Sequence, residues 1–174
     1  MIRDLVKELR IFERNKVPEE IKILGIAIYF QTSSFRRTAR ILSELHKVSY
    51  NAVRRWIKKI EEKLPIATEK KPRNLIAIDE TIVKANKKRY YVYSAVDVER
   101  NELILMKVYM TRNWLVTRSF VKEVLKYCES KPKFVIDRAP WLIKALKNLD
   151  LEFEHEGLRE TAYSSKDILL LYYI

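Results

Sequence analysis

The sequence is poor in the residues that build covalent cross-links and soft metal sites. Its 174 residues include one cysteine, Cys128, and two histidines, His46 and His155. A single cysteine excludes a disulfide framework and a cysteine-based zinc site. Two histidines are too few for a histidine-based metal site, so we interpret both as surface residues. Cys128 lies in an expected helix, where a buried structural thiol explains it better than a nucleophile does.

Glycine and long apolar runs are also scarce. The glycines are Gly25 and Gly157, and we find no internal repeat with a period of roughly 20 to 50 residues, which excludes the repeat architectures. No stretch approaches the roughly 18 to 20 consecutive apolar residues of a membrane span, and the first residues lack a signal-peptide core. With 48% apolar residues, we expect a globular protein of the cytoplasm that has no membrane partner.

Acidic residues are outnumbered by basic ones. The chain has 35 Lys and Arg against 23 Asp and Glu, which gives a formal net charge of +12. A surplus of this size favours a polyanionic partner, because Lys and Arg release the counterions that such a partner holds. Nucleic acid is the first candidate, and an anionic membrane surface is the second, which the lack of a long apolar run weakens.

The first 64 residues have a helical pattern with capping signals. We expect helices over Pro18–Gln31, over Phe35–His46 with Ser34 as N-cap, and from Ser49 to Leu64. The last two helices, joined by a short turn, resemble a helix-turn-helix whose second helix enters the major groove of DNA. The alternative is the solvated basic face of an ordinary three-helix bundle. The candidate DNA-binding residues are Arg36, Arg37, Arg40, Tyr50, Asn51, Arg54, Arg55 and Lys58.

A polar, basic stretch flanked by prolines, residues 65–74, is expected to link these helices to a second part, residues 75–174. That second part alternates β-rich and amphipathic segments, which predicts an α/β fold with a mixed sheet and flanking helices. Because a strand–helix–strand crossover is right-handed, the strand before Asp137 should run parallel to a neighbour. The expected strands are residues 75–78, 89–96, 103–109, 133–136 and 151–155, and the expected helices are 117–129 and 140–149.

Two aspartates each follow an apolar run. Asp79 follows Leu75–Ile78, and Asp137 follows Lys133–Ile136. If those strands are neighbours, the two carboxylates emerge close together and repel each other unless a cation bridges them. Oxygen ligands of this kind suit Mg²⁺ or Mn²⁺, so Asp79 and Asp137 are the candidate metal ligands. Isolated aspartates at strand ends are usually structural, and that is how we interpret Asp97, which precedes a turn.

The stretches AIDETIVKANKKRYYVYSAVDVERNELI and FVIDRAPWLIKAL resemble the catalytic domain of DDE-type insertion-sequence transposases. The resemblance covers about residues 20–160 and includes the upstream helix-turn-helix. It implies a ribonuclease-H-like fold for residues 75–174, with Asp79 and Asp137 as the first two carboxylates of a metal-binding triad. Lys84, Arg112 and Arg138 could contact phosphates, although exposed basic residues without a special role explain them better.

The C-terminal region departs from the family pattern. The family places its third acid, a glutamate, on a basic helix, and here that position falls near Tyr163. Glu160 is the nearest candidate for the third catalytic carboxylate, with Asp167 as a weaker one, and the domain is predicted to be incomplete through truncation or a frameshift.

The resemblance implies a transposase that binds element ends and target DNA, cleaves and joins strands with Mg²⁺ or Mn²⁺, and acts as a homo-oligomer. Loss of the third carboxylate would make it inactive. The alternatives are a non-catalytic DNA-binding remnant or repressor of the element, and a simple ribonuclease-H-like nuclease, against which the N-terminal helices argue.

Overall fold

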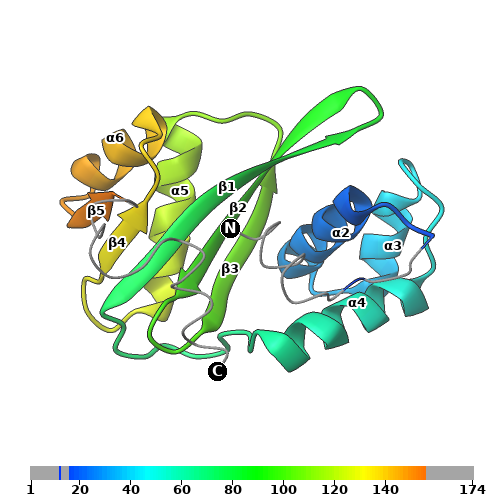
Figure 1. Cartoon of the computed structure of the whole chain (residues 1–174), viewed down its shortest axis with the longest axis horizontal. Helices are drawn as coiled ribbons and strands as arrows, with labels where there is room; N and C mark the ends of the chain where they lie inside the picture. The colour runs from blue at the N-terminus through cyan, green and yellow to red at the C-terminus, as the bar shows by residue number, and fades with distance from the viewer. Residues whose placement is uncertain (1–11, 13–15, 156–174) are drawn as a thin grey trace.

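The structure is a computed structural model, and it describes residue 12 and residues 16–155 (Figure 1). Within these residues, three helices precede a sheet with further helices. The elements are α2 (Glu19–Thr32), α3 (Phe35–Leu42), α4 (Tyr50–Lys63), β1 (Leu75–Ala85), β2 (Lys88–Asp97), β3 (Glu102–Tyr109), α5 (Trp114–Val124), the short 3₁₀ turn η1 (Leu125–Tyr127), β4 (Lys133–Ile136), α6 (Pro140–Asn148) and β5 (Phe153–His155).

The sheet has five strands in the order β3-β2-β1-β4-β5. The pairs β1–β2 and β2–β3 are antiparallel, whereas β4 runs parallel to β1 and to β5. The predicted mixed sheet and the predicted parallel neighbour of β4 are therefore confirmed.

Helices cover both faces of the sheet. Apolar side chains that point to one face, such as Ile76 and Ile78 of β1, pack with α5 and α6. Side chains that alternate with them, such as Val83 of β1 and Val92 of β2, join the core of helices α2–α4 on the other face. Figure 1 shows α5 and α6 beside one half of the sheet and the three-helix bundle beside the other. The bundle and part of the sheet thus share one apolar core.

The bundle has the capping predicted from its sequence. The Ser34 hydroxyl accepts a hydrogen bond from the Arg37 amide at 3.4 Å, and the Ser49 hydroxyl accepts one from the Ala52 amide at 3.2 Å. Each bond satisfies one of the backbone donors that a helix leaves free at its N-terminus. Helix α3 is shorter than expected, and hydrogen-bonded turns continue it as far as His46.

Helix α2 packs against the edge strand β3, and one amide side chain adds hydrogen bonds to this contact. The Gln31 side chain donates from Nε2 to the Val108 carbonyl at 3.4 Å, and its Oε1 accepts from the Val108 amide at 3.1 Å. The side chain thereby satisfies the two backbone groups that a neighbouring strand would otherwise pair.

The segment between bundle and sheet, residues 65–74, lies along the sheet. Leu103 at the start of β3 donates to the Pro65 carbonyl at 2.8 Å and accepts from the Ala67 amide at 2.9 Å. Further on, the Lys71 amide donates to the Tyr127 carbonyl at 3.2 Å. The predicted connection is therefore held by backbone hydrogen bonds at both of its ends, while the division into domains on either side of it stays a prediction.

Arg73, in the same segment, is the largest fully buried side chain in the described part of the protein. Its Nη1 lies 2.7 Å from Asp97 Oδ2, its Nη2 lies 2.6 Å from Glu102 Oε2, and its Nε donates to the Tyr127 carbonyl at 3.0 Å. Burial by itself lowers the pKa of Arg73, but the hydrogen bonds to Glu102 and Asp97 outweigh burial, so the pKa is raised and the guanidinium stays charged. The structural role predicted for Asp97 is confirmed.

Candidate metal centre and nucleic-acid interface

The parallel pairing of β1 with β4 brings Asp79 and Asp137 to corresponding positions. Ile78 pairs with Ile136, and the two aspartates are the next residues of their chains. Neighbouring strands lie about 4.8 Å apart, so the two backbones are close where the carboxylates begin. Asp79 is half-buried and Asp137 is exposed. Both side chains therefore have access to solvent or to a ligand.

The prediction that Asp79 lies at the end of its strand was wrong. β1 continues to Ala85, because β2 goes on pairing with it after β4 has ended. Asp79 therefore lies in the middle of a strand, opposite Ser94 of β2. Asp137 does follow the last residue of β4, and one of its oxygens, Oδ1, accepts a hydrogen bond from the Ala139 amide at 3.0 Å just before α6. That bond fixes the turn from β4 into α6.

Asp79 and its neighbour Glu80 point to opposite faces of the sheet, because successive side chains of a strand alternate. The charge of Glu80 is met by Arg112, whose Nη1 lies 3.2 Å from Glu80 Oε1. The guanidinium carbon of Arg112 lies 4.2 Å from the centre of the Trp141 ring, within the range of a cation–π contact. Arg112, a possible phosphate contact from its sequence position, is thus engaged with protein groups.

Glu80 also affects the tyrosine across from it. Burial, with a further contribution from the Glu80 charge, raises the pKa of Tyr93 well above its ordinary value. The Tyr93 hydroxyl therefore remains protonated, at 3.1 Å from the Thr117 hydroxyl. The face of the sheet with Glu80 is a packed structural layer, and the Asp79 side chain lies on the other face.

The described residues do not by themselves complete a three-carboxylate site. In residue 12 and residues 16–155, no group of three His, Cys, Asp or Glu side chains could hold a metal ion. Glu160 and Asp167, the candidates for a third acid, lie outside the described residues. The donor set that is present, two carboxylates at adjacent register positions, has the hard oxygen chemistry that Mg²⁺ and Mn²⁺ require.

The bundle exposes the basic side chains that the sequence singled out. In α4 the apolar residues Val53, Trp56, Ile57 and Ile60 are buried. The outward orientation predicted for the polar residues is confirmed, because all eight candidate DNA-binding side chains are exposed: Arg36, Arg37, Arg40, Tyr50, Asn51, Arg54, Arg55 and Lys58.

Two of these side chains meet between the helices. The Arg36 guanidinium carbon lies 5.7 Å from the centre of the Tyr50 ring, which links the starts of α3 and α4. Both residues, with Arg54, line a surface hollow of about 510 Å³. The hollow opens on the face of the bundle where the basic side chains gather.

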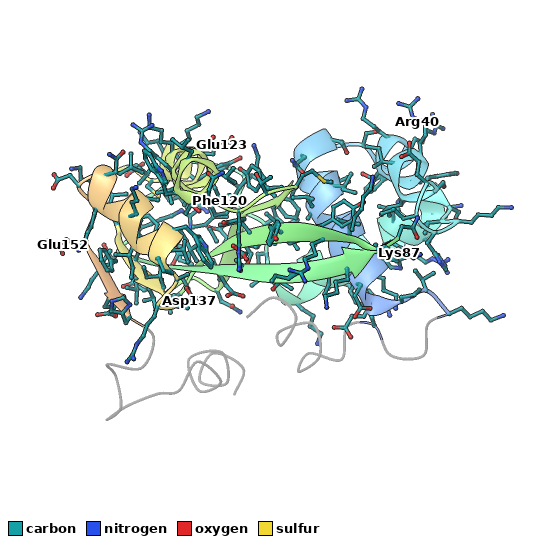
Figure 2. The ribbon with its side chains drawn as sticks, turned by 90° about the horizontal axis from the view of Figure 1, so that it is seen from above. Arg40, Lys87, Phe120, Glu123, Asp137 and Glu152 are labelled. Atoms are coloured by element: carbon teal, nitrogen blue, oxygen red, sulfur yellow. The ribbon has the colours of Figure 1, made fainter. Side chains whose placement is uncertain are left out.

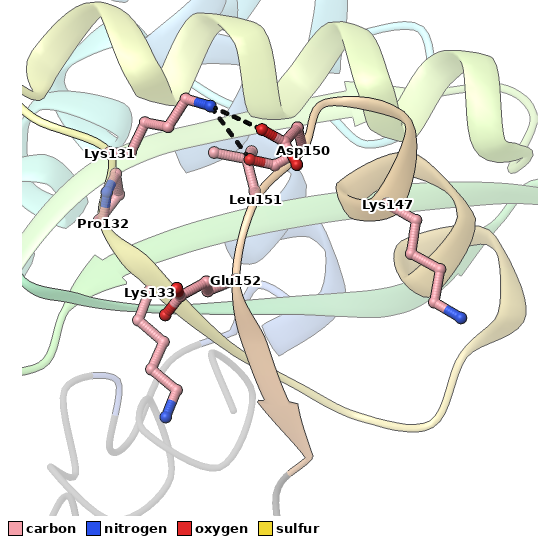
Figure 3. Close-up of a pocket in the computed structure, with 7 residues that line it drawn as sticks. All are labelled: Lys131, Pro132, Lys133, Lys147, Asp150, Leu151 and Glu152. Carbon is pink, nitrogen blue, oxygen red and sulfur yellow. Dashed lines mark hydrogen bonds and ion pairs between the residues drawn. The ribbon is translucent and has the colours of Figure 1, made fainter.

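A second hollow lies at the other half of the molecule and has mixed charge. It measures about 530 Å³ and is lined by three lysines, Lys131, Lys133 and Lys147, together with acids such as Asp150 (Figure 3). Lys131 is paired with Asp150 at 3.2 Å. Since β4 starts at Lys133 and ends at Ile136, this hollow is at the opposite end of β4 from Asp137.

Comparison with known proteins shows the family of the chain. A sequence model of a family described as a DDE domain matches residues 74–165, which include Asp79, Asp137 and Glu160. The chain belongs to the DDE transposase family. The ribonuclease-H-like fold that was predicted for the sheet and its helices is confirmed.

One other protein is similar to this DDE family member in sequence, and two solved structures are similar to it in part of their fold. An uncharacterised protein of Methanocaldococcus jannaschii is 40% identical over 171 residues, which are 97% of this chain and 79% of that protein. Among solved structures, the catalytic core domain of HTLV-2 integrase, a dimer with magnesium, is 16% identical, with a TM-score of 0.41 over 51% of this chain and 63% of that chain. An intasome of simian T-cell lymphotropic virus is 10% identical, with a TM-score of 0.45 over 86% of this chain and 56% of that chain. The chain thus spans less than two thirds of either viral protein chain.

No helix among the described residues is long and apolar enough to cross a membrane.

Two features of this DDE family member were not predicted from its sequence: the burial of Arg73 and the ion pair between Glu80 and Arg112. The buried Arg73 stands in a stretch so polar that it reads as a connection, and nothing local marks it as interior. The pairing of Glu80 with Arg112 joins residues 32 positions apart. The only sequence signal for it was the presence of a second acid after an apolar run.

Proposed function

We propose that this protein is a transposase that binds the ends of its own element and carries out metal-dependent cleavage and joining of DNA strands. One observation carries the proposal: in a chain of the DDE family, the register of β1 and β4 sets Asp79 beside Asp137. Two carboxylates so close repel each other, and a bridging divalent cation offsets that repulsion.

Asp79 and Asp137 would hold Mg²⁺ or Mn²⁺, and Glu160 is proposed as the third carboxylate. When bound, a divalent metal in such a site activates a water or a 3′-hydroxyl for in-line displacement at phosphorus. Asp79 follows the last residue of β1 that pairs with β4 and is itself paired with Ser94 of β2, so the sheet fixes its backbone position. Arg138 is exposed next to Asp137 and is proposed to contact a phosphate of the scissile strand.

The exposed basic face of α3 and α4 is proposed to bind the element ends as a helix-turn-helix. The N-terminal turns of α4, with Asn51, Arg54 and Arg55, would reach base edges in the major groove. Arg36, Arg37 and Arg40 would contact the phosphate backbone, which sets the position of the protein on DNA. We further propose that the protein works in the cytoplasm as a homo-oligomer on paired ends, with residues 1–64 and 75–174 as its two domains.

The test is a nicking assay on DNA that carries the element ends, with Mn²⁺ as the metal. Asp79→Asn should abolish nicking and should also abolish the rise in thermal midpoint that Mn²⁺ produces in the unmodified protein. The matched control is Asp150→Asn, because Asp150 is fully exposed, lies at the other end of β4, and adopts a left-handed backbone conformation that asparagine tolerates. Equal nicking by the two variants would refute the catalytic proposal.

The same experiment separates the non-catalytic alternative. A protein that binds end-containing DNA but neither nicks it nor responds to Mn²⁺ would be a DNA-binding remnant or repressor. Binding that stays constant as salt rises would instead contradict the DNA interface, because contacts to phosphates predict a steep fall in affinity with salt.

A further inference from the structure

The hairpin formed by β1 and β2 extends beyond the rest of the sheet. β4 pairs with β1 only as far as Ile78, and the pairing of β3 with β2 ends at Tyr91. The part of the hairpin between Val83 and Tyr90 therefore has no strand on either side, and Figure 1 shows it projecting on the side of the bundle. Its turn is formed by Asn86 and Lys87, with φ of 47° and 61°, as in tight hairpins of type I′.

This extension is anchored to the bundle. A two-stranded ribbon by itself is only marginally stable in water. Here Val83 is fully buried in the core that the sheet shares with the bundle, and Tyr90 packs against the same core. At the tip, the Asn86 side chain donates to the Glu44 carbonyl, in the connection between α3 and α4, at 3.3 Å. The tip is thus fixed next to the proposed helix-turn-helix.

The hairpin carries four exposed basic residues and no acid between Thr81 and Tyr93: Lys84, Lys87, Lys88 and Arg89. None of the four forms an ion pair with a residue that the structure describes. Lys84 is directly opposite Arg89 in the strand register. Like charges in that position destabilise a sheet, so the hairpin tolerates a repulsion that an anionic partner would relieve.

The orientation of these charges follows from the register. Ala85 and Tyr90 face the bundle, so Lys84 and Arg89 project from the opposite side of the ribbon, and Lys87 and Lys88 stand at its end. Figure 2 shows Lys87 at the tip, in the half of the molecule that also carries Arg40, whereas Asp137 lies in the other half. A second basic element therefore lies next to the connection between α3 and α4, to which the Asn86 side chain joins its tip.

We propose that the hairpin over residues 83–90 is a second DNA-binding element, which contacts the phosphate backbone of the duplex held by α3 and α4. A two-stranded ribbon is narrow enough to follow a DNA groove, and lysines at its end suit phosphates, which carry no sequence information. The inference rests on the proposed DNA binding by the bundle. It adds contacts from the catalytic sheet itself, so that the duplex is held by two parts of the chain.

The test compares the affinities of variants for a random-sequence DNA duplex. Fluorescence anisotropy measures each affinity at a series of salt concentrations. The hairpin variant is Lys87→Gln with Lys88→Gln and Arg89→Gln. The bundle variant is Arg54→Gln with Arg55→Gln. The control removes three positive charges, as many as the hairpin variant, from α5, η1 and α6. Its substitutions are Lys122→Gln, Lys126→Gln and Lys147→Gln, all at exposed positions.

The hairpin variant should bind about tenfold more weakly than the control or worse, and the salt slope should fall by about 2 to 3, because each phosphate contact contributes roughly 0.9. Its thermal midpoint should stay the same or rise, since removing Arg89 relieves the repulsion with Lys84. The double variant at the tip, Lys87→Gln with Lys88→Gln, leaves the packed part of the hairpin untouched and should lose affinity in the same direction.

The outcomes separate the two proposals. If the bundle variant loses affinity but the hairpin variant matches the control, the hairpin inference is overturned and the bundle interface stands. If the bundle variant also matches the control, the proposed helix-turn-helix function fails. A hairpin variant that binds DNA normally but no longer self-associates in sedimentation would show that its partner is a second copy of the chain, which also overturns the inference.

Discussion

Replacement of Arg73 by methionine tests whether the buried ion cluster holds the connecting segment to the sheet. Methionine fills much of the same volume without charge, so the substitution removes the guanidinium rather than opening a large cavity. It leaves the carboxylates of Asp97 and Glu102 facing each other with side-chain exposures of 0% and 11%.

Removing one partner of a buried ion pair costs about 3 to 5 kcal/mol, because the remaining charge loses its main compensation. Here the more distant partners that remain are Arg100, 3.7 Å from Asp97, and Lys71, 3.7 Å from Glu102. Since a whole domain is stabilised by about 5 to 15 kcal/mol, Arg73→Met should remove a large fraction of the stability. For a chain of this size we expect the thermal midpoint to fall by roughly 6 to 20 °C. Urea denaturation followed by tryptophan fluorescence measures the free energy of unfolding, and circular dichroism measures the thermal midpoint.

Lys71→Met provides the matched control. Its ammonium lies 3.7 Å from the same Glu102 but is one third exposed, so its loss should cost less than about 1 kcal/mol. Combining Arg73→Met with Asp97→Asn and Glu102→Gln should recover part of the loss, since the two buried carboxylate charges are then removed as well. A loss for Arg73→Met no larger than that of the control would refute the reasoning.

Three other substitutions or measurements test the packing and the chemistry. Gly25→Ala would place a Cβ 2.8 Å from Leu42 Cδ1, so overpacking should outweigh the gain in helix propensity and leave a net loss of about 1 kcal/mol in urea denaturation; a more stable variant would show that Leu42 moves aside freely. Ser49→Ala removes the N-cap of α4 and should cost about 1 kcal/mol by the same assay, whereas an unchanged free energy of unfolding would mean that the cap is dispensable. Burial raises the pKa of Cys128 to about 11, so the thiol stays protonated below that pH and should react with a disulfide reagent at pH 8 only after unfolding; rapid reaction of the folded protein would contradict its burial.

Much of this fold could be predicted from local patterns. The strand Lys133–Ile136 and the N-caps Ser34 and Ser49 lie where the sequence placed them, because apolar periodicity and capping are signals read within a few residues. The parallel neighbour of β4 followed from the handedness of a crossover. The adjacency of Asp79 and Asp137 then needed only the right choice of neighbouring strands.

What could not be predicted depends on contacts between distant parts of the chain. The length of β1 is set by its pairing with β2, so the apolar run that ends at Ile78 marks only the part that is covered by α5 and α6. Arg73 is buried only because Asp97 and Glu102, about 25 residues later, neutralise it. Likewise, nothing near Gln31 in the sequence indicates that its amide meets Val108 of β3.

That single amide has a consequence for how copies of this protein can meet. An outer strand with unpaired backbone groups is a template on which other chains add strands, and that route leads to aggregation as readily as to assembly. At Val108 both groups are already occupied by Gln31. Growth of the sheet across β3 from one molecule to the next is therefore blocked at that point.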